Sequence, residues 1–339
     1  MSEDLNDKHR KDELPNDPAQ GGVPMASDVP RTLTVSDLLR DSEQRALAPR
    51  SALHSTTGHY LIDRATGGFE RGSVWAFGAE TNWGKSSWLV MIADENIRAG
   101  KRVLIVSAED DQKLYGDRLL IRRSRVSAER FKAKMLQPDE RDRIREVVKA
   151  GEDQPVFFDA RGRSAEWVAI RTKQLVKEYA IDVVAFDYLQ AFDSDKRHQD
   201  RRNQVSYIAR ALTDVAKLAN ISGIIFSQIT ISEGRQYPDK NSIKESKDVG
   251  NAAEIVVMGF TAAKQIMRRD GSTLIEAGER ALNLDKNKSG PKGMFPVRWD
   301  ANSACFDVSL DPEVQRYQDI TGGAFDNYGD KPTEYGNGY

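Results

Sequence analysis

A glycine, a lysine and a serine follow an apolar run in this chain, and together they carry the groups that bind phosphate. The run is 74–77, and the three residues are Gly84, Lys85 and Ser86. Backbone N–H groups at a helix start attract anionic oxygens, an ammonium group neutralises them, and a hydroxyl is a ligand for Mg²⁺. A strand, this loop and a helix over 87–98 therefore predict a site for a triphosphate and its magnesium ion.

The loop departs from the usual spacing in one place. The pattern G-x-x-x-x-G-K-[ST] requires its first glycine at position 79, where this chain has Ala79, and Gly78 comes one place early. A Gly-Lys-Ser string alone also occurs in ordinary strand-to-helix turns, but the flanking strand and helix favour a phosphate-binding loop. The predicted nucleotide-binding residues are Ala79, Glu80, Thr81, Asn82, Trp83, Gly84, Lys85, Ser86 and Ser87.

Polar side chains follow three further apolar runs, each at the point where a strand is expected to end. They are Glu109, Asp187 and Gln228. A single carboxylate in such a place is usually a helix cap or a solvated loop residue. In a parallel sheet, however, ligands lie at the carboxyl ends of the strands, where all three would face Lys85. We expect Asp187 to hold Mg²⁺ together with Ser86, Glu109 to orient the attacking water, and Gln228 to sense the γ-phosphate.

Composition limits the class of protein. The 339 residues have a net charge of −2, so no overall positive field attracts nucleic acid and any such contact must be local. The single cysteine, Cys305, excludes an internal disulfide and a cysteine-rich zinc site and fits a reducing compartment. No apolar run approaches membrane-spanning length and the N-terminus does not resemble a signal peptide, so we expect a cytoplasmic protein.

The order of the elements predicts an α/β fold with a mostly parallel sheet flanked by helices. Expected strands are 73–77, 102–107, 156–158, 182–186, 223–227 and 254–258, and strands 282–286 and 294–299 form a C-terminal hairpin. We expect a disordered tail over 1–31, a linker helix within 32–50 that opens on a capping box at Thr34, one ATPase domain over 51–310 and a disordered tail over 311–339.

From about Thr57 to Val308 the chain resembles the motor domain of DnaB-type replicative DNA helicases, which has a RecA-like P-loop NTPase core. The phosphate loop of that family also begins with Ala rather than Gly. The segments that carry the resemblance are Thr57-Gly58, Ile62-Asp63, Thr66-Gly67-Gly68, Val106-Ser107-Ala108-Glu109, Phe186-Asp187-Tyr188-Leu189-Gln190, Ser227-Gln228, Ile243-Lys244-Glu245-Ser246 and Lys286-Asn287-Lys288-Ser289-Gly290-Pro291-Lys292-Gly293. The Walker-B segment with Asp187 is the most specific of these.

The resemblance implies ATP hydrolysis at subunit interfaces of a hexameric ring, with ATP and Mg²⁺ as cofactors. Its catalytic set would be Lys85, Glu109 and Gln228 from one subunit with Lys286 and Lys288 from the next. Lys288 stands where the family has an arginine finger, so its charge is kept but the planar bidentate fork is lost. The family's separate N-terminal helical domain is not expected here, and the helix from Thr34 to about Leu47 resembles its linker helix, which docks on the adjacent subunit.

Contact with DNA would fall to loops that face the central channel. The candidates are Lys244, Glu245, Lys247, Arg201 and Arg202. Lys247 stands where the family has glycine, and the basic stretch 196–202 is equally compatible with a solvated loop. Contacts of this type read backbone charge, so binding is expected to tolerate any sequence and to weaken with salt.

The leading hypothesis is an ATP-dependent helicase that assembles on single-stranded DNA and unwinds forked duplex DNA, with primase, a loader or other replication proteins as further partners. The alternatives are a nucleotide-gated DNA-binding scaffold or helicase loader, and a RecA-type recombination or regulatory ATPase. The string Asp187-Tyr188-Leu189-Gln190 and the Gly290-Pro291 hairpin disfavour the RecA type.

Overall fold

The computed structural model describes residues 34–48, 54–151, 156–231, 235, 237–243, 247–268, 271–288 and 290–306. An eight-stranded sheet forms the centre, in the order β12-β11-β8-β3-β7-β6-β4-β5. Its strands are β3 (Val74–Ala79), β4 (Val103–Ser107), β5 (Phe157–Asp159), β6 (Val183–Asp187), β7 (Ser222–Gln228), β8 (Ile255–Thr261), β11 (Arg280–Asn287) and β12 (Gly293–Pro296). Six strands are parallel and the β11–β12 hairpin is antiparallel, so the predicted α/β class is confirmed.

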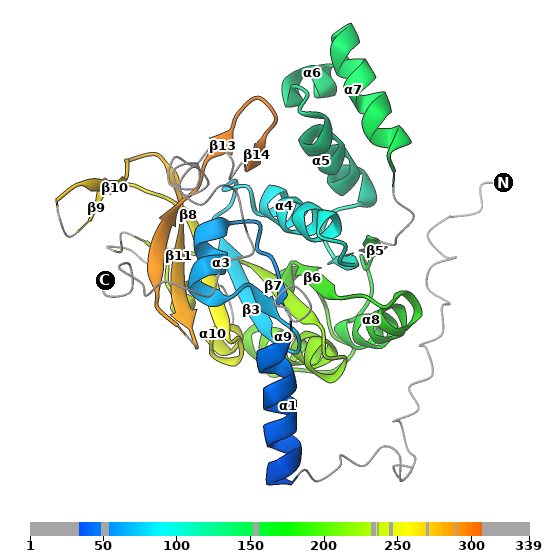
Figure 1. Ribbon diagram of the computed structural model, residues 1–339, viewed down its shortest axis with the longest axis vertical. Helices are drawn as coiled ribbons and strands as arrows, with labels where there is room; N and C mark the ends of the chain where they lie inside the picture. The colour runs from blue at the N-terminus through cyan, green and yellow to red at the C-terminus, as the bar shows by residue number, and fades with distance from the viewer. Residues whose placement is uncertain are drawn as a thin grey trace.

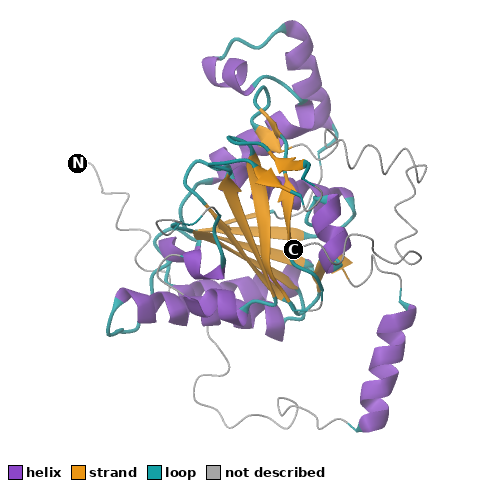
Figure 2. Ribbon diagram, turned by 90° about the vertical axis from the view of Figure 1, so that its left-hand side faces the viewer, coloured by secondary structure: helices purple, strands orange, loops and turns teal. Residues whose placement is uncertain are grey.

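Helices cover both faces of this sheet, as Figures 1 and 2 show. The alternation of side chains along β3 separates the two faces. Val74 and Ala76 belong to a core with α8 (Ala165–Tyr179) and α9 (Arg201–Leu218), whereas Trp75 and Phe77 belong to a second core with α4 (Lys85–Arg98). Since every residue of β3 is buried, the sequence shows a continuous apolar run there rather than an alternating pattern.

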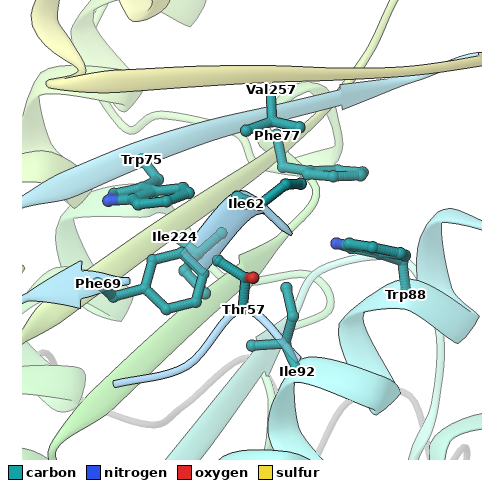
Figure 3. Close-up of a pocket in the computed structure, with 9 residues that line it drawn as sticks. All are labelled: Thr57, Ile62, Phe69, Trp75, Phe77, Trp88, Ile92, Ile224 and Val257. Atoms are coloured by element: carbon teal, nitrogen blue, oxygen red, sulfur yellow. The ribbon is translucent and has the colours of Figure 1, made fainter. Parts of the chain in front are cut away.

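A small apolar cavity lies inside the second core. Its lining comes from the sheet, from α4 and from the part of the chain that precedes β3. Figure 3 shows the lining residues: Thr57, Ile62, Phe69, Trp75, Phe77, Trp88, Ile92, Ile224 and Val257. Apart from the indole nitrogens of the two tryptophans, the hydroxyl of Thr57 is the one polar side-chain group among these lining residues. We therefore assign the cavity to the core and not to the functional site.

Three helices continue from β4 and rise above the body of the domain (Figure 1). They are α5 (Gln112–Ser124), α6 (Ala128–Ala133) and α7 (Pro138–Lys149). Glu140 in the first turn of α7 is buried and accepts two hydrogen bonds from Arg130, at 2.7 and 2.9 Å. It also accepts backbone N–H groups of Ser127 and Gln137. This one carboxylate therefore ties the start of α6 to the start of α7.

Helix α1 (Val35–Leu47) projects from the lower edge of the domain in Figure 1 and stands apart from the body in Figure 2. Thr34 and Asp37 form the predicted capping box, and no residue of the helix is buried. The apolar side chains of Val35, Leu38 and Leu39 are all more than half exposed. The apolar face of α1 therefore has no surface to pack on among the described residues of the single chain. So short a helix is only marginally stable in water without such a surface.

The C-terminal strands differ from the prediction at one end. The second strand of the hairpin was expected to run to Trp299, but β12 ends at Pro296. Trp299 instead begins β13 (Trp299–Asp300), which pairs with β14 (Cys305–Phe306) in a small sheet of its own. The prediction was wrong because Trp299 pairs with Phe306 in a separate short hairpin and not with β11.

The remaining elements are short. They are β1 (His54–Ser55), α3 (Tyr60–Thr66), β2 (Phe69–Glu70), η1 (Leu189–Ala191), η2 (Lys240–Ser242), α10 (Lys247–Ala252), β9 (Ile266–Met267) and β10 (Thr273–Ile275). Within the described ranges, every helix is too short or too polar to cross a bilayer. The predicted tails over 1–31 and 311–339 lie outside the described residues.

Candidate functional site

The loop between β3 and α4 has the backbone that the sequence pattern requires. Gly84 caps α4 with a φ of 111°, a left-handed conformation that favours glycine. A side chain is also excluded by space, because a Cβ atom at Gly84 would lie 3.0 Å from Phe306 and 3.1 Å from Trp299. The small β13–β14 sheet thus packs directly on this loop. Lys85 and Ser86 occupy the first turn of α4, where free N–H groups are available to anions.

Trp83 anchors the same loop to the core. Its side chain is buried, its indole Nε1 donates to the carbonyl of Phe260 at 2.9 Å, and its ring lies against Gly259. A Cβ atom at Gly78 would lie 2.5 Å from Ile229 and 2.6 Å from Met258, so this glycine serves packing within β3. Ala79 is the last residue of that strand and is buried. Position 79, where the pattern has glycine, is therefore a buried strand residue in this chain, and Trp83 anchors the loop that follows it.

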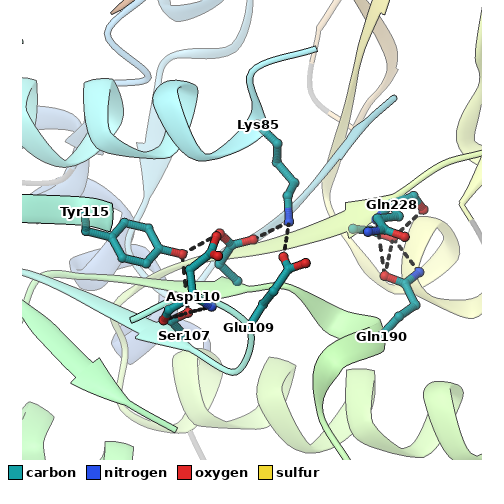
Figure 4. A network of polar contacts seen from close by, with 9 residues as sticks. Lys85, Ser107, Glu109, Asp110, Tyr115, Gln190 and Gln228 are labelled. Carbon is teal, nitrogen blue, oxygen red and sulfur yellow. Dashed lines mark hydrogen bonds and ion pairs between the residues drawn. The ribbon is translucent and has the colours of Figure 1, made fainter. Parts of the chain in front are cut away.

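Lys85, Glu109 and Asp187 come together at the carboxyl ends of β3, β4 and β6, as Figure 4 shows for Lys85 and Glu109. Nζ of Lys85 lies 2.5 Å from Oδ1 of Asp187 and 3.9 Å from Oε2 of Glu109. The same ammonium lies 4.0 Å from the ring centre of Tyr188. Asp187 is fully buried, so in this state the lysine neutralises a carboxylate that has no access to water.

Tyr115 completes the surroundings of Asp187. Its hydroxyl donates to Oδ2 of Asp187 at 2.6 Å and lies 3.4 Å from Oγ of Ser107. Burial, and after it the charge of Asp187, raises the pKa of Tyr115 well above its ordinary value. The hydroxyl therefore stays protonated and acts as a donor to the carboxylate.

Glu109 and Asp110 follow β4 at the open side of this cluster. Partial burial raises the pKa of both carboxyls, against the opposing effect of Lys85. Oγ of Ser107 accepts the backbone N–H of Asp110 and donates to its carbonyl, at 3.0 and 2.7 Å, which fixes the turn after the strand. A half-exposed carboxylate with a raised pKa has the basicity and the access that a residue orienting a water molecule needs.

Gln228 ends β7, and its position is set by Gln190 from η1 (Figure 4). Oε1 of Gln190 accepts the backbone N–H of Gln228 at 3.2 Å, and its Nε2 donates to Oγ of Ser227 at 2.9 Å. The side chain of Gln190 thus links the segment after Asp187 to the strand that carries Gln228.

A magnesium ion fits the donor set at this place. Mg²⁺ prefers hard oxygen ligands and is usually held by one or two protein groups together with phosphate oxygens and water. The hydroxyl of Ser86, in the first turn of α4, and the carboxylate of Asp187, at the end of β6, are such oxygens. Both belong to the set that the sequence predicted.

The two lysines expected to act on a neighbouring subunit differ in their surroundings. Nζ of Lys286 donates to three carbonyls at the end of α10, those of Gly250, Asn251 and Ala253, at 2.5 to 3.2 Å. Burial lowers the pKa of Lys286, and Lys240 lowers it further. Lys288 is exposed in the hairpin turn that follows β11. Of the two, Lys288 is the one whose side chain is presented to solvent.

The candidate DNA-binding residues are only partly covered by the structure. Lys244 and Glu245 lie outside the described residues, and of Lys247 only the helical backbone is described. Arg201 donates to Oε1 of Gln204 at 2.7 Å and to the carbonyl of Gln190 at 2.6 Å. Arg202 is exposed at the start of α9. Arg201 therefore already has structural contacts within its own chain.

Sequence reasoning missed Tyr115, Gln190 as a link to β7, and Arg118. Arg118 donates to Oγ of Ser87, and its Nε is buried without a partner among the described residues. Tyr115 and Arg118 lie on α5, which follows Glu109, and no motif marks either position. The signal that could have identified them is that α5 directly follows the strand end that carries Glu109.

The chain was also compared with known proteins. Residues 55–308 match the model of the family described as DnaB-like helicase C terminal domain. The chain is 24% identical over 258 residues to a probable replicative DNA helicase of Trieres chinensis, which covers 74% of this chain and 56% of that protein. It is also 24% identical over 275 residues to the replicative DNA helicase DnaB of Treponema pallidum (strain Nichols), covering 80% and 60%. The chain thus spans little more than half the length of these relatives.

Solved structures show the same fold. One structure, described as an ATPase domain, superposes with a TM-score of 0.70 at 21% identity, over 80% of this chain and 96% of that one. A structure described as a DnaB-like replicative helicase and its interactions with primase gives a TM-score of 0.69 at 21% identity, over 80% and 67%. The fold-class prediction is confirmed by both.

Proposed function

The chain belongs to the family of DnaB-like helicase C-terminal domains, which are ATPase domains, and from that membership we propose that it is an ATP-driven DNA helicase. It assembles as a ring on single-stranded DNA in the cytoplasm and unwinds forked duplex DNA during replication. The observation that carries the proposal is the meeting of Lys85, Glu109 and Asp187 at the ends of three parallel strands. The lysine of this cluster comes from the loop with the phosphate-binding pattern, and an ion pair with a purely structural role would not require that loop.

Each residue has a defined task in this proposal. When ATP binds, Lys85 leaves Asp187 for the β- and γ-phosphates, and the N–H groups of the first turn of α4 bind phosphate oxygens. Ser86 and Asp187 would hold a magnesium ion, which would supply positive charge beside the phosphates. Glu109 orients the attacking water, and Gln228 contacts the γ-phosphate and transmits its loss to β7.

The neighbouring subunit completes the site. Lys288 at the hairpin turn approaches the γ-phosphate of the next subunit and stabilises its developing charge. Lys286 was expected to join it, but its three carbonyl contacts on α10 would first have to break. We therefore propose Lys288 as the principal cation acting between subunits. Such a head-to-tail contact either closes into a ring or continues as a filament, and we propose a hexameric ring.

DNA binds in the channel of that ring through Lys244, Glu245 and Lys247 before and in α10, and through Arg201 and Arg202. Primase or a loader is proposed as a further partner because one similar structure is described with primase. A nucleotide-gated scaffold or loader is the second candidate. It is favoured by the lysine at position 288, because a lysine lacks the bidentate fork of an arginine and stabilises the transition state less well.

The deciding experiment compares strand separation on a forked DNA substrate by the wild type and by Lys85→Ala, with ATP and Mg²⁺ present. The wild type is expected to unwind the fork and the variant to lose both unwinding and ATP turnover. Equal strand separation by the two proteins would rule out the motor. Wild-type protein that binds ATP and single-stranded DNA, yet neither hydrolyses nor unwinds, would establish the scaffold.

A further inference from the structure

Both oxygens of the Asp187 carboxylate are occupied, each by a different partner. Oδ1 lies 2.5 Å from Nζ of Lys85, and Oδ2 accepts the hydroxyl of Tyr115 at 2.6 Å. Asp187 is fully buried and Tyr115 is 5% exposed, so bulk water does not compete for either oxygen. The carboxylate is therefore held in one orientation, in which Oδ1 faces Lys85 and Oδ2 faces Tyr115.

The two partners differ in how firmly they are held. Lys85 has a flexible side chain, and under the proposed function its ammonium moves to the phosphates of ATP. Tyr115 lies on α5, and its ring packs against Phe157 at 5.2 Å between ring centres. Asp111 caps the start of the same helix through hydrogen bonds to the N–H groups of Lys113 and Leu114. Tyr115 is thus held by contacts that do not involve Lys85.

We propose that Tyr115 is a positioning residue for the magnesium site. By holding Oδ2 it leaves Oδ1 as the one oxygen of Asp187 that faces the ion or its water shell. The inference rests on the proposed function, since it needs Asp187 to serve magnesium. Donors that orient a metal-binding carboxylate typically account for a roughly 10- to 100-fold difference in metal affinity.

The test is Tyr115→Phe, which removes one oxygen atom and keeps the ring. The affinity of a fluorescent, non-hydrolysable ATP analogue is measured in EDTA and at saturating Mg²⁺, and the ratio of the two dissociation constants gives the effect of magnesium. Binding in EDTA is expected to be unchanged, and the effect of magnesium is expected to fall about tenfold, at the lower end of the range for such donors. An unchanged ratio would overturn the inference.

Tyr179→Phe is the matched control. Tyr179 on α8 donates its hydroxyl to a carboxylate as well, that of Glu178, but away from the site. It is expected to leave both dissociation constants unchanged. If it lowers the effect of magnesium as much as Tyr115→Phe does, the loss is not specific to Asp187 and the inference fails.

A double-mutant cycle shows whether Tyr115 acts through Asp187. In an Asp187→Asn background, Tyr115→Phe is expected to have no further effect on the ratio, because the oriented carboxylate is already gone. Should Tyr115→Phe alone fail to fold, a buried and unpartnered carboxylate oxygen is the expected reason, and adding Asp187→Leu, which replaces the carboxylate by an apolar group of similar shape, must restore folding. Failure of that rescue would contradict the proposal.

The experiment also separates this inference from the proposed function. If the wild type binds no nucleotide, the proposed function fails and the inference with it. If the wild type binds the analogue with a clear effect of magnesium and Tyr115→Phe behaves identically, only the role of Tyr115 is lost.

Discussion

The two carboxylates at the strand ends, Asp187 and Glu109, differ in their exposure to solvent. Asp187 is fully buried and satisfied by hydrogen bonds, which suits a fixed charge, whereas the side chain of Glu109 is 41% exposed and only 3.9 Å from Lys85. Partial burial raises the pKa of Glu109, so it is a stronger base than an ordinary glutamate. Under the proposed function, the two carboxylates therefore have different tasks because their surroundings differ.

Glu109→Gln is expected to keep nucleotide affinity and to lower ATP turnover by about 10²- to 10⁴-fold, because the amide cannot accept a proton from the attacking water. Steady-state phosphate release and binding of the fluorescent analogue measure the two effects. Asp142→Asn, an exposed carboxylate on α7 that pairs with Arg145, provides the control. Turnover at the wild-type rate in Glu109→Gln would remove this residue from its proposed role.

At the level of elements, the parallel strands were predictable, whereas the contacts between distant elements were not. Runs such as 103–107 and 183–187 are apolar almost throughout because parallel strands are buried on both faces, and the polar residue at the end of each run marks the site. The contact between Tyr115 and Asp187 joins residues 72 positions apart. No local pattern encodes such a contact, since it depends on how α5 packs against α4 and β5.

Helix α1 exposes an apolar face, and under the proposed function that face docks on the adjacent subunit. Leu38→Asp is expected to leave the free energy of unfolding of the single domain within about 0.5 kcal/mol, because the side chain is already exposed. Assembly is expected to weaken, since a charge would have to be buried at the contact. Light scattering with ATP present measures the oligomer size. Gln44→Asp, on the opposite face of the helix, is expected to assemble normally, and equal assembly by Leu38→Asp would refute the docking role.

Glu140 makes the stability of the α6–α7 region depend on pH. Hydrogen bonds from Arg130, and then from the backbone of Ser127 and Gln137, lower its pKa from 4.5 to about 2. Because the folded-state pKa lies below the unfolded value, the stabilisation is present above pH 4.5 and is lost as the pH falls towards 2. Glu140→Gln removes it at all pH values.

Urea unfolding of the wild type and of Glu140→Gln between about pH 2.5 and 6 checks this dependence. The variant is expected to be clearly less stable at the upper end of this range, and the difference is expected to shrink as the pH falls. Asp142→Asn, an exposed carboxylate on the same helix paired with Arg145, serves as the control and is expected to show no such convergence. A difference that stays constant with pH would mean that packing, and not charge, accounts for the effect.

At the scale of the whole molecule, the proposed site needs two copies of the chain. One contributes Lys85 and Glu109, and the other contributes Lys288. A heterologous interface of this kind pairs each nucleotide side with the hairpin of the neighbour, so defects on the two sides can complement one another. Mixing two inactive variants and measuring ATP turnover therefore tests whether neighbouring subunits share a site.

Glu109→Gln and Lys288→Ala are each expected to be nearly inactive alone, because every interface then lacks one of the two groups. In an equal mixture, a Lys288→Ala subunit with an intact Glu109 meets a Glu109→Gln subunit with an intact Lys288 at about a quarter of randomly formed interfaces. ATP turnover is therefore expected to recover to a comparable fraction of the wild-type rate. Glu109→Gln mixed with Lys85→Ala must stay inactive, since both defects lie on the same side of the interface. If the first mixture were as inactive as the second, Lys288 would not act on the site of a neighbour. Any ATP hydrolysis would then take place within single subunits.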